Sequence, residues 1–183
     1  MEKAGLQGNM PAVVACGSRQ GAYDSFCIAA RTGEQALLLV DSEESVNARY
    51  QKGEPEEWKP WGHLHQRQGD QWQKPQGTDD LACHLMVQCM ETWFLADRAS
   101  LCHFFGQGFN TNALPSEKSR LESIDKGRIY KALLDASRAC KTKGKYGKGP
   151  HSFKILEQID PTKITGASPW ARRFVDTARS KMG

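Results

Sequence analysis

The chain has 183 residues, of which 39% are hydrophobic and 25% are charged, as is usual for one folded globular domain. Its longest apolar run, residues 36–40, is far shorter than the roughly 18 residues that a membrane-spanning helix needs. Residues 1–5 also lack an apolar signal core, so we expect a cytoplasmic protein with no membrane partner.

The net charge is +4, but its sign changes along the chain. Residues 1–116 hold 9 Lys and Arg against 14 Asp and Glu, whereas residues 117–183 hold 16 against 7. This asymmetry predicts an acidic site in the first part and a surface facing a polyanion in the second. Charge alone leaves open the simpler alternative of two solvated faces.

The cysteines predict buried thiols in a reducing compartment rather than a zinc site. None of them forms a Cys-x-x-Cys pair, and most lie in apolar stretches. Structural zinc usually needs paired ligands at short spacing. The six are Cys16, Cys27, Cys83, Cys89, Cys102 and Cys140.

The first predicted elements are typical of a βαβ unit. Residues 2–6 resemble the last turn of a helix that has almost nothing before it. Residues 12–16 predict a short buried strand, and residues 20–31 carry apolar side chains at helical spacing. Residues 35–41 form the clearest strand, because a continuous apolar run ends in an acid. Runs that are apolar on both faces belong to covered, usually parallel, sheets.

Residues 44–80 predict a long irregular insertion, because prolines and glycines break any regular period there. We expect its tryptophans, Trp58, Trp61 and Trp72, to pack on the edge of the sheet. Residues 83–90 return to a strand pattern.

Asp97 can cap a short helix that ends at Phe105. The last third of the chain is also predicted to be helical. An apolar stripe over residues 129–140 and a similar pattern at 152–159 predict two further helices. Ser168 followed by Pro169 is typical of the start of another.

Asp41 and Glu43 are candidate metal ligands, since they follow the clearest strand, where α/β sheets place their ligands. Two carboxylates two residues apart can converge on one side, and such oxygen ligands suit Mg²⁺ or Mn²⁺. An exposed acidic turn is the alternative. Glu91 also stands out, because an acid among Met90 and Trp93 is costly to bury without a cation or a hydrogen-bond partner.

A basic, glycine-rich loop separates the first two of the three helices predicted in residues 129–183. It could clamp phosphates of a nucleic acid, and one of its lysines could stabilise charge in a transition state. A solvated run of charges is the alternative. The candidate nucleic-acid-binding residues are Lys141, Lys143, Lys145, Lys148 and His151.

Three stretches together resemble a bacterial family described only as a domain of unknown function and grouped with the Toprim-like domains. They are Leu-Leu-Val-Asp-Ser-Glu at 38–43, His-Leu-Met-Val-Gln-Cys-Met-Glu-Thr-Trp-Phe-Leu-Ala-Asp at 84–97, and Tyr-Gly-Lys-Gly-Pro-His at 146–151. The resemblance covers nearly the whole chain. It implies one Toprim-like domain over residues 1–183, with a mainly parallel sheet flanked by helices.

Toprim domains occur in topoisomerases, primases and nucleases of the overcoming-lysogenization-defect type, and they hold Mg²⁺ with a glutamate and an Asp-x-Asp pair. By this resemblance Asp41 and Glu43 match the pair, with glutamate replacing the second aspartate. Glu91 matches a further acid of the nuclease branch, and Lys148, with Lys145 as second choice, matches its catalytic lysine. The resemblance therefore gives Glu91 and Lys148 catalytic roles.

The chain departs from the family at its start. Members usually begin with a strand and a Glu-Gly turn, whereas this chain resembles them only from near the end of the helix that follows, so we expect the first strand to be absent. A misassigned start, a trimmed product or a degenerate domain that binds without cutting would each explain this.

The resemblance predicts a Mg²⁺- or Mn²⁺-dependent nuclease-type enzyme, with an ATPase partner in a bacterial antiphage defence system. One alternative is a non-catalytic module that binds nucleic acid or an acidic partner through its basic region. Another is a subunit that regulates a partner without touching nucleic acid.

Overall fold

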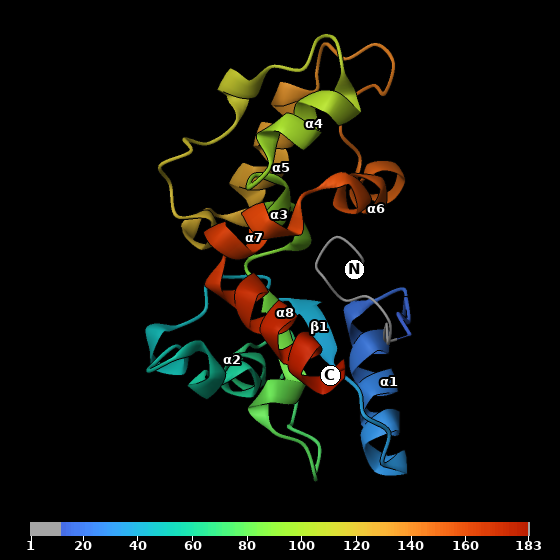
Figure 1. Ribbon diagram of the computed structural model, residues 1–183, viewed down its shortest axis with the longest axis vertical. Coiled ribbons are helices and arrows are strands. Elements are labelled where there is room, and N and C mark those ends of the chain that lie inside the picture. Colours follow the sequence, from blue (N-terminus) through green and yellow to red (C-terminus); the bar gives the residue numbers. More distant parts are fainter. Residues whose placement is uncertain (1–11, 183) are drawn as a thin grey trace.

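The computed structural model describes residues 12–182, so the helix end expected at residues 2–6 lies outside the described part of the chain. At its centre is a parallel sheet of two strands, β1 (Leu38–Asp41) and β2 (Cys83–Met86). The register pairs Leu38 with Cys83 and Asp41 with Met86. Helices surround this sheet, so the α/β class is confirmed, although the sheet is smaller than expected (Figure 1).

Both strands form because their side chains are buried. Leu38 and Val40 are each 3% exposed, and Cys83 and Leu85 are fully buried. The pairing continues past the end of β1, where the Ser42 N–H donates to Met86 O at 3.0 Å. Asp41 is therefore held at the edge of the sheet where both parallel strands end.

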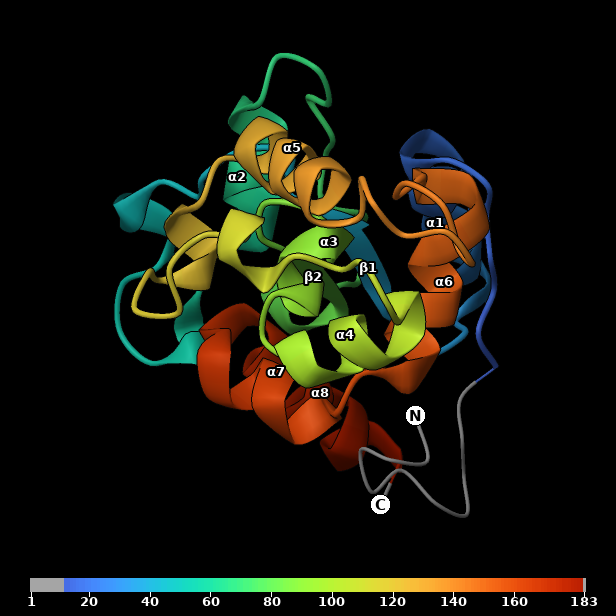
Figure 2. The same cartoon turned by 90° about the horizontal axis from the view of Figure 1, so that it is seen from above.

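The predicted strand at residues 12–16 is wrong. This segment has no strand partner among the described residues, and Val13 and Val14 are 75% and 73% exposed. The helix that follows is present as α1 (Arg19–Thr32), capped by Ser18. It packs beside β1, whereas α2 (Pro60–Gln66) lies on the β2 side of the sheet (Figure 2).

The insertion at 44–80 is irregular apart from α2 and short 3₁₀ turns. Its three tryptophans are at most 8% exposed and share one apolar core with the strands. Trp72 stacks on Tyr23 of α1, with ring centroids 4.6 Å apart. Helix α2 was missed because it has only seven residues and no capping side chain precedes its first residue, a proline. The turns are η2 (Ala48–Tyr50), η3 (Pro55–Glu57) and η4 (Asp80–Ala82).

The strand predicted over 83–90 ends early, at Met86, because Met90 already begins a helix. Asp97 caps α4 by accepting from Ser100 N at 3.3 Å, as expected. Ser168 Oγ likewise accepts from Ala171 N at 3.1 Å at the start of the last helix. The elements of this region are α3 (Met90–Phe94), α4 (Arg98–Phe105), η5 (Thr111–Ala113), η6 (Leu121–Ser123), α5 (Lys126–Ala136), α6 (Lys148–Gln158), α7 (Pro161–Ala167) and α8 (Pro169–Met182).

These helices build a second apolar core, with Phe94, Ile129, Leu133 and Ile155 all fully buried. Helices α3 to α6 gather at one end of the molecule, and α8 runs back beside the sheet (Figure 1). The acidic end of β1 therefore faces the helical part of the chain. No helix within residues 12–182 is long and apolar enough to cross a membrane.

All six cysteines are free thiols, and three of them, Cys83, Cys89 and Cys140, are buried. Burial raises the pKa of Cys89 to about 11, so this thiol stays protonated at neutral pH.

Candidate functional site

Asp41, the last residue of β1, is buried at the centre of the candidate site. Its Oδ1 accepts from the Met90 N–H at 2.8 Å, which ties the strand end to the first residue of α3. Burial raises the pKa of Asp41 to about 6, and the nearby Glu91 and Glu43 carboxylates add to the rise. Lys148 and the Met90 N–H oppose it. The ionised form of Asp41 is thus less favourable in the folded chain than in water.

Glu91 is fully buried on α3 and is held by three hydroxyl groups. Its Oε1 accepts from Tyr146 at 2.8 Å and from Ser152 at 3.2 Å, and its Oε2 accepts from Tyr130 at 3.2 Å. Burial, together with the nearby negative charge, raises the pKa of both tyrosines, so they keep their protons and act as donors. These bonds satisfy a carboxylate that would otherwise be costly to bury.

Lys148, the first residue of α6, joins the two acids. Its Nζ lies 3.7 Å from Asp41 Oδ2 and 4.0 Å from Glu91 Oε2, and it donates to the Tyr130 hydroxyl at 3.0 Å. The lysine side chain is 57% exposed, so one end of this cluster opens to solvent. Two acids and a lysine from three separate elements therefore meet beyond the end of β1.

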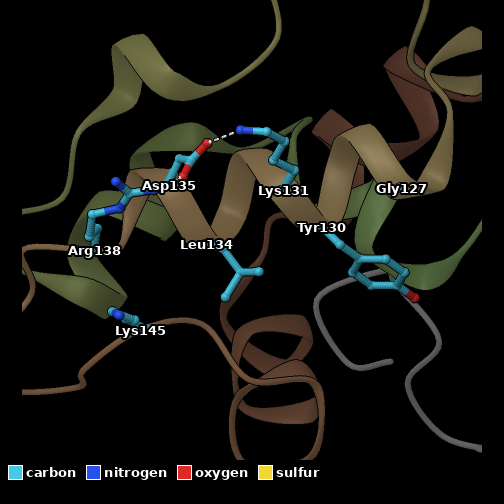
Figure 3. Close-up of a pocket in the computed structure, with 7 residues that line it drawn as sticks. All are labelled: Gly127, Tyr130, Lys131, Leu134, Asp135, Arg138 and Lys145. Atoms are coloured by element: carbon cyan, nitrogen blue, oxygen red, sulfur yellow. Dashed lines mark hydrogen bonds and ion pairs between the residues drawn. The ribbon is translucent and has the colours of Figure 1, made fainter.

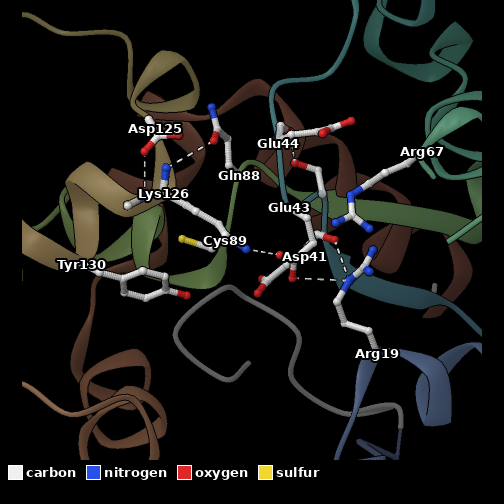
Figure 4. A network of polar contacts seen from close by, with 12 residues as sticks. Arg19, Asp41, Glu43, Glu44, Arg67, Gln88, Cys89, Asp125, Lys126 and Tyr130 are labelled. Atoms are coloured by element: carbon white, nitrogen blue, oxygen red, sulfur yellow. Dashed lines mark hydrogen bonds and ion pairs between the residues drawn. The ribbon is translucent and has the colours of Figure 1, made fainter. Parts of the chain in front are cut away.

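Glu43 lies beside Asp41 but has other partners (Figure 4). Its carboxylate pairs with Lys126, at the start of α5, and lies 3.7 Å from Arg19 Nε. The backbone of Glu43 is left-handed, with φ of 67°, and its N–H donates to Gln88 O at 2.8 Å. A glutamate adopts this conformation at a cost of about 1 kcal/mol, and such strained residues cluster at functional sites.

Arg19 and Lys126 are parts of this network that the sequence did not indicate. Arg19 Nε donates to the Asp41 carbonyl at 3.0 Å (Figure 4). Its guanidinium also pairs with Asp70. The Lys126 N–H donates to Gln88 Oε1 at 3.2 Å. No motif marks either residue, because each reaches Glu43 from a distant part of the chain.

The predicted nucleic-acid-binding residues are dispersed. Lys148 is at the acids, and Lys145 lines a groove beside Tyr130. Lys141 is exposed, and Lys143 Nζ lies 5.1 Å from the centroid of the Phe104 ring.

His151 lies inside the fold, 9% exposed, where its Nδ1 accepts from Gly147 N at 3.0 Å. Burial lowers its pKa, so it stays neutral and supports the loop.

Within residues 12–182, no group of three or more His, Cys, Asp or Glu side chains is placed to hold a metal ion. Two carboxylates are nevertheless a suitable donor set for Mg²⁺, which is commonly held by one or two carboxylates while water and substrate phosphate fill its other positions. Asp41 Oδ2 and Glu91 Oε2 both face Lys148. Each oxygen also has a lone pair left for a cation. Asp41 and Glu91 are therefore the residues that would hold a hydrated divalent ion.

Comparison with known proteins gives a family but no characterised relative. No curated protein and no solved structure matches the chain. A family model described as Domain of unknown function (DUF4276) matches residues 4–178, which is nearly the whole chain. The chain belongs to this family, Domain of unknown function DUF4276.

Proposed function

We propose that this chain is a Toprim-like, nuclease-type domain that cleaves phosphodiester bonds with the help of Mg²⁺ or Mn²⁺. The observation that supports the proposal is the meeting of Asp41, Glu91 and Lys148 at the carboxyl edge of a parallel sheet. In α/β folds this edge is the usual place for a ligand.

The surroundings of each residue suggest its role in this reaction. Asp41 and Glu91 would hold the ion, which when bound would activate water and neutralise the leaving oxygen. The Met90 N–H fixes Asp41, while Tyr146 and Ser152 fix Glu91, so both acids are held in place by hydrogen bonds before any cation binds.

Lys148 is the exposed member of the cluster. Its exposed ammonium would leave the acids when a cation arrives and place its charge against a phosphate oxygen.

The finer parts of the proposal rest on resemblance. The Toprim-like assignment depends on residues 38–43, 84–97 and 146–151, and an ATPase partner and a defence role depend on that assignment. The cytoplasmic location is proposed separately, from the short apolar runs and the lack of an apolar signal core at residues 1–5.

The direct test is cleavage of labelled DNA and RNA, single-stranded and duplex, with Mg²⁺, Mn²⁺ or EDTA. Asp41→Asn and Glu91→Gln should each lower the metal-dependent rate by about 100-fold or more, and Lys148→Ala should do the same. Glu44→Gln removes an exposed acid from the same loop and should leave the rate unchanged. Cleavage that persists in Asp41→Asn, or no cleavage of any substrate by the wild type, would contradict the proposal.

A second candidate function is nucleic-acid binding without catalysis. One observation favours it, because every acid of the site already has a cationic partner. Asp41 and Glu91 share Lys148, and Glu43 pairs with Lys126. Binding that weakens steeply with salt and survives Asp41→Asn, with no cleavage in Mg²⁺ or Mn²⁺, would support this function.

A further inference from the structure

A groove of about 560 Å³ runs along the exposed side of α5 (Figure 3). Tyr130 and Leu134 are four residues apart, so they lie on the same face of the helix. Both project from the side of α5 on which Lys145 of the basic loop lies (Figure 3). Leu134 is 44% exposed, which is unusual for a large apolar side chain in this chain. The volume lies in the range of small-molecule sites.

The border of the groove is mainly cationic. Arg138 and Lys145 line one part of it, and their side chains are exposed. Lys131 lines it as well and pairs with Asp135 at 2.9 Å, and Asp135 also pairs with Arg138. The groove is therefore lined by three cations and one carboxylate, and this excess of positive charge favours an anionic ligand.

Tyr130 connects this groove to the candidate site. Its ring lines the groove, while its hydroxyl donates to Glu91 and accepts from Lys148. The Lys148 ammonium lies 5.5 Å from the centroid of the same ring. A ligand that contacts the Tyr130 ring in the groove would thus lie close to Glu91 and Lys148.

We infer that this groove takes one unpaired base of a single-stranded nucleic acid, with a neighbouring phosphate held by Arg138 and Lys145. An apolar, partly aromatic floor with cations at its border suits the flat face of a base and the charge of its backbone. A base inside a duplex does not present that face, because it is covered by its stacked neighbours. The inference rests on the proposed function and names its substrate class.

The test is a binding assay without metal. Fluorescence anisotropy in EDTA compares a labelled single strand of about a dozen nucleotides with the same sequence as a duplex. The single strand should bind about tenfold more tightly or better.

Leu134→Glu should weaken single-strand binding by about tenfold, since it adds an anion to the floor. Ile28→Glu is the matched control, because Ile28 is 54% exposed on α1, and it should bind like the wild type.

A second variant tests the cations. Lys145→Ala should reduce the slope of log Kd against log salt by about 0.7, the value for one phosphate contact on a single strand. Thermal unfolding of all variants checks that they fold, which these exposed positions allow.

The inference is overturned if the duplex binds as tightly as the single strand, if neither binds, or if Leu134→Glu binds like the wild type. It is separable from the proposed function. Tight single-strand binding with no cleavage in Mg²⁺ or Mn²⁺ would refute the proposed nuclease function and support base binding in the groove. Cleavage that Leu134→Glu leaves unchanged, with no preference for single strands, would refute base binding in the groove and support the nuclease function.

Discussion

Replacing Asp41 with asparagine should stabilise the folded chain at about pH 8, although it removes a residue of the candidate site. Burial raises the pKa of this carboxyl from 3.8 to about 6, so the folded chain binds the proton more tightly than the unfolded chain does. Below about pH 4 both states are protonated, and the group makes no difference to stability. As the pH rises from about 4 to about 6 the charged form accumulates, and the free energy of unfolding falls.

The size of the stability gain follows from the difference between the pKa of Asp41 in the unfolded chain and in the folded chain. A rise of about two pH units corresponds to about 3 kcal/mol, which is the upper bound on the gain. Asparagine keeps an oxygen for the Met90 N–H but leaves Lys148 with Glu91 alone. The lysine is 57% exposed, so water replaces most of the lost attraction. We therefore expect a net gain of about 1–2 kcal/mol.

Urea unfolding at about pH 8 and about pH 4 measures this difference, with Glu44→Gln as the control. The gain should be present at the higher pH and nearly absent at the lower. Addition of Mg²⁺ at the higher pH should raise the unfolding midpoint of the wild type and leave that of Asp41→Asn unchanged. The reasoning is refuted if Asp41→Asn is less stable than the wild type at about pH 8, or if the difference is the same at both pH values.

Two further predictions concern stability away from the acids. Arg173 is 1% exposed and its guanidinium donates to three backbone carbonyls, so Arg173→Ala should lower the free energy of unfolding by about 3–5 kcal/mol in guanidinium titrations. Arg172→Ala, next to it and exposed, should cost far less, and equal losses would argue against this account. Although burial opposes ionisation of Asp97, hydrogen bonds from Lys163 and Ser100 outweigh it and lower its pKa to about 2. The stabilisation that the Asp97 carboxylate provides is therefore present above about pH 4 and is lost as the pH falls towards 2. Asp97→Ala should lower the free energy of unfolding by about 1–2 kcal/mol at neutral pH and by progressively less in acid, as followed by thermal unfolding. A loss that does not depend on pH would contradict this prediction.

Part of the candidate site could be predicted from the sequence, because the signals are local. Asp41 ends the strongest apolar run, which forms β1 as predicted. Glu91 was singled out because an acid in an apolar segment needs partners, and it has three hydroxyl donors and Lys148. The resemblance indicated Lys148 ahead of Lys145, and the structure places Lys148 between the two acids.

Other features depend on partners that local patterns do not specify. Residues 12–16 have the composition of a buried strand, but a strand also needs a neighbour with free backbone groups, and none pairs with this segment in the described part of the chain. The pairing of Glu43 with Lys126 and Arg19 likewise joins residues far apart in the sequence.

The sequence by itself determined the apolar strand that ends at Asp41, the capped helices of the last third and the basic character of that region. These depend on periodicity, caps and charge within a few turns of chain. Only the tertiary structure decided that Asp41, Glu91 and Lys148 meet and that Tyr130 links them to a groove along α5. Those contacts join residues from 18 to 107 positions apart, and they form because burying two apolar cores brings the end of β1 against the helices.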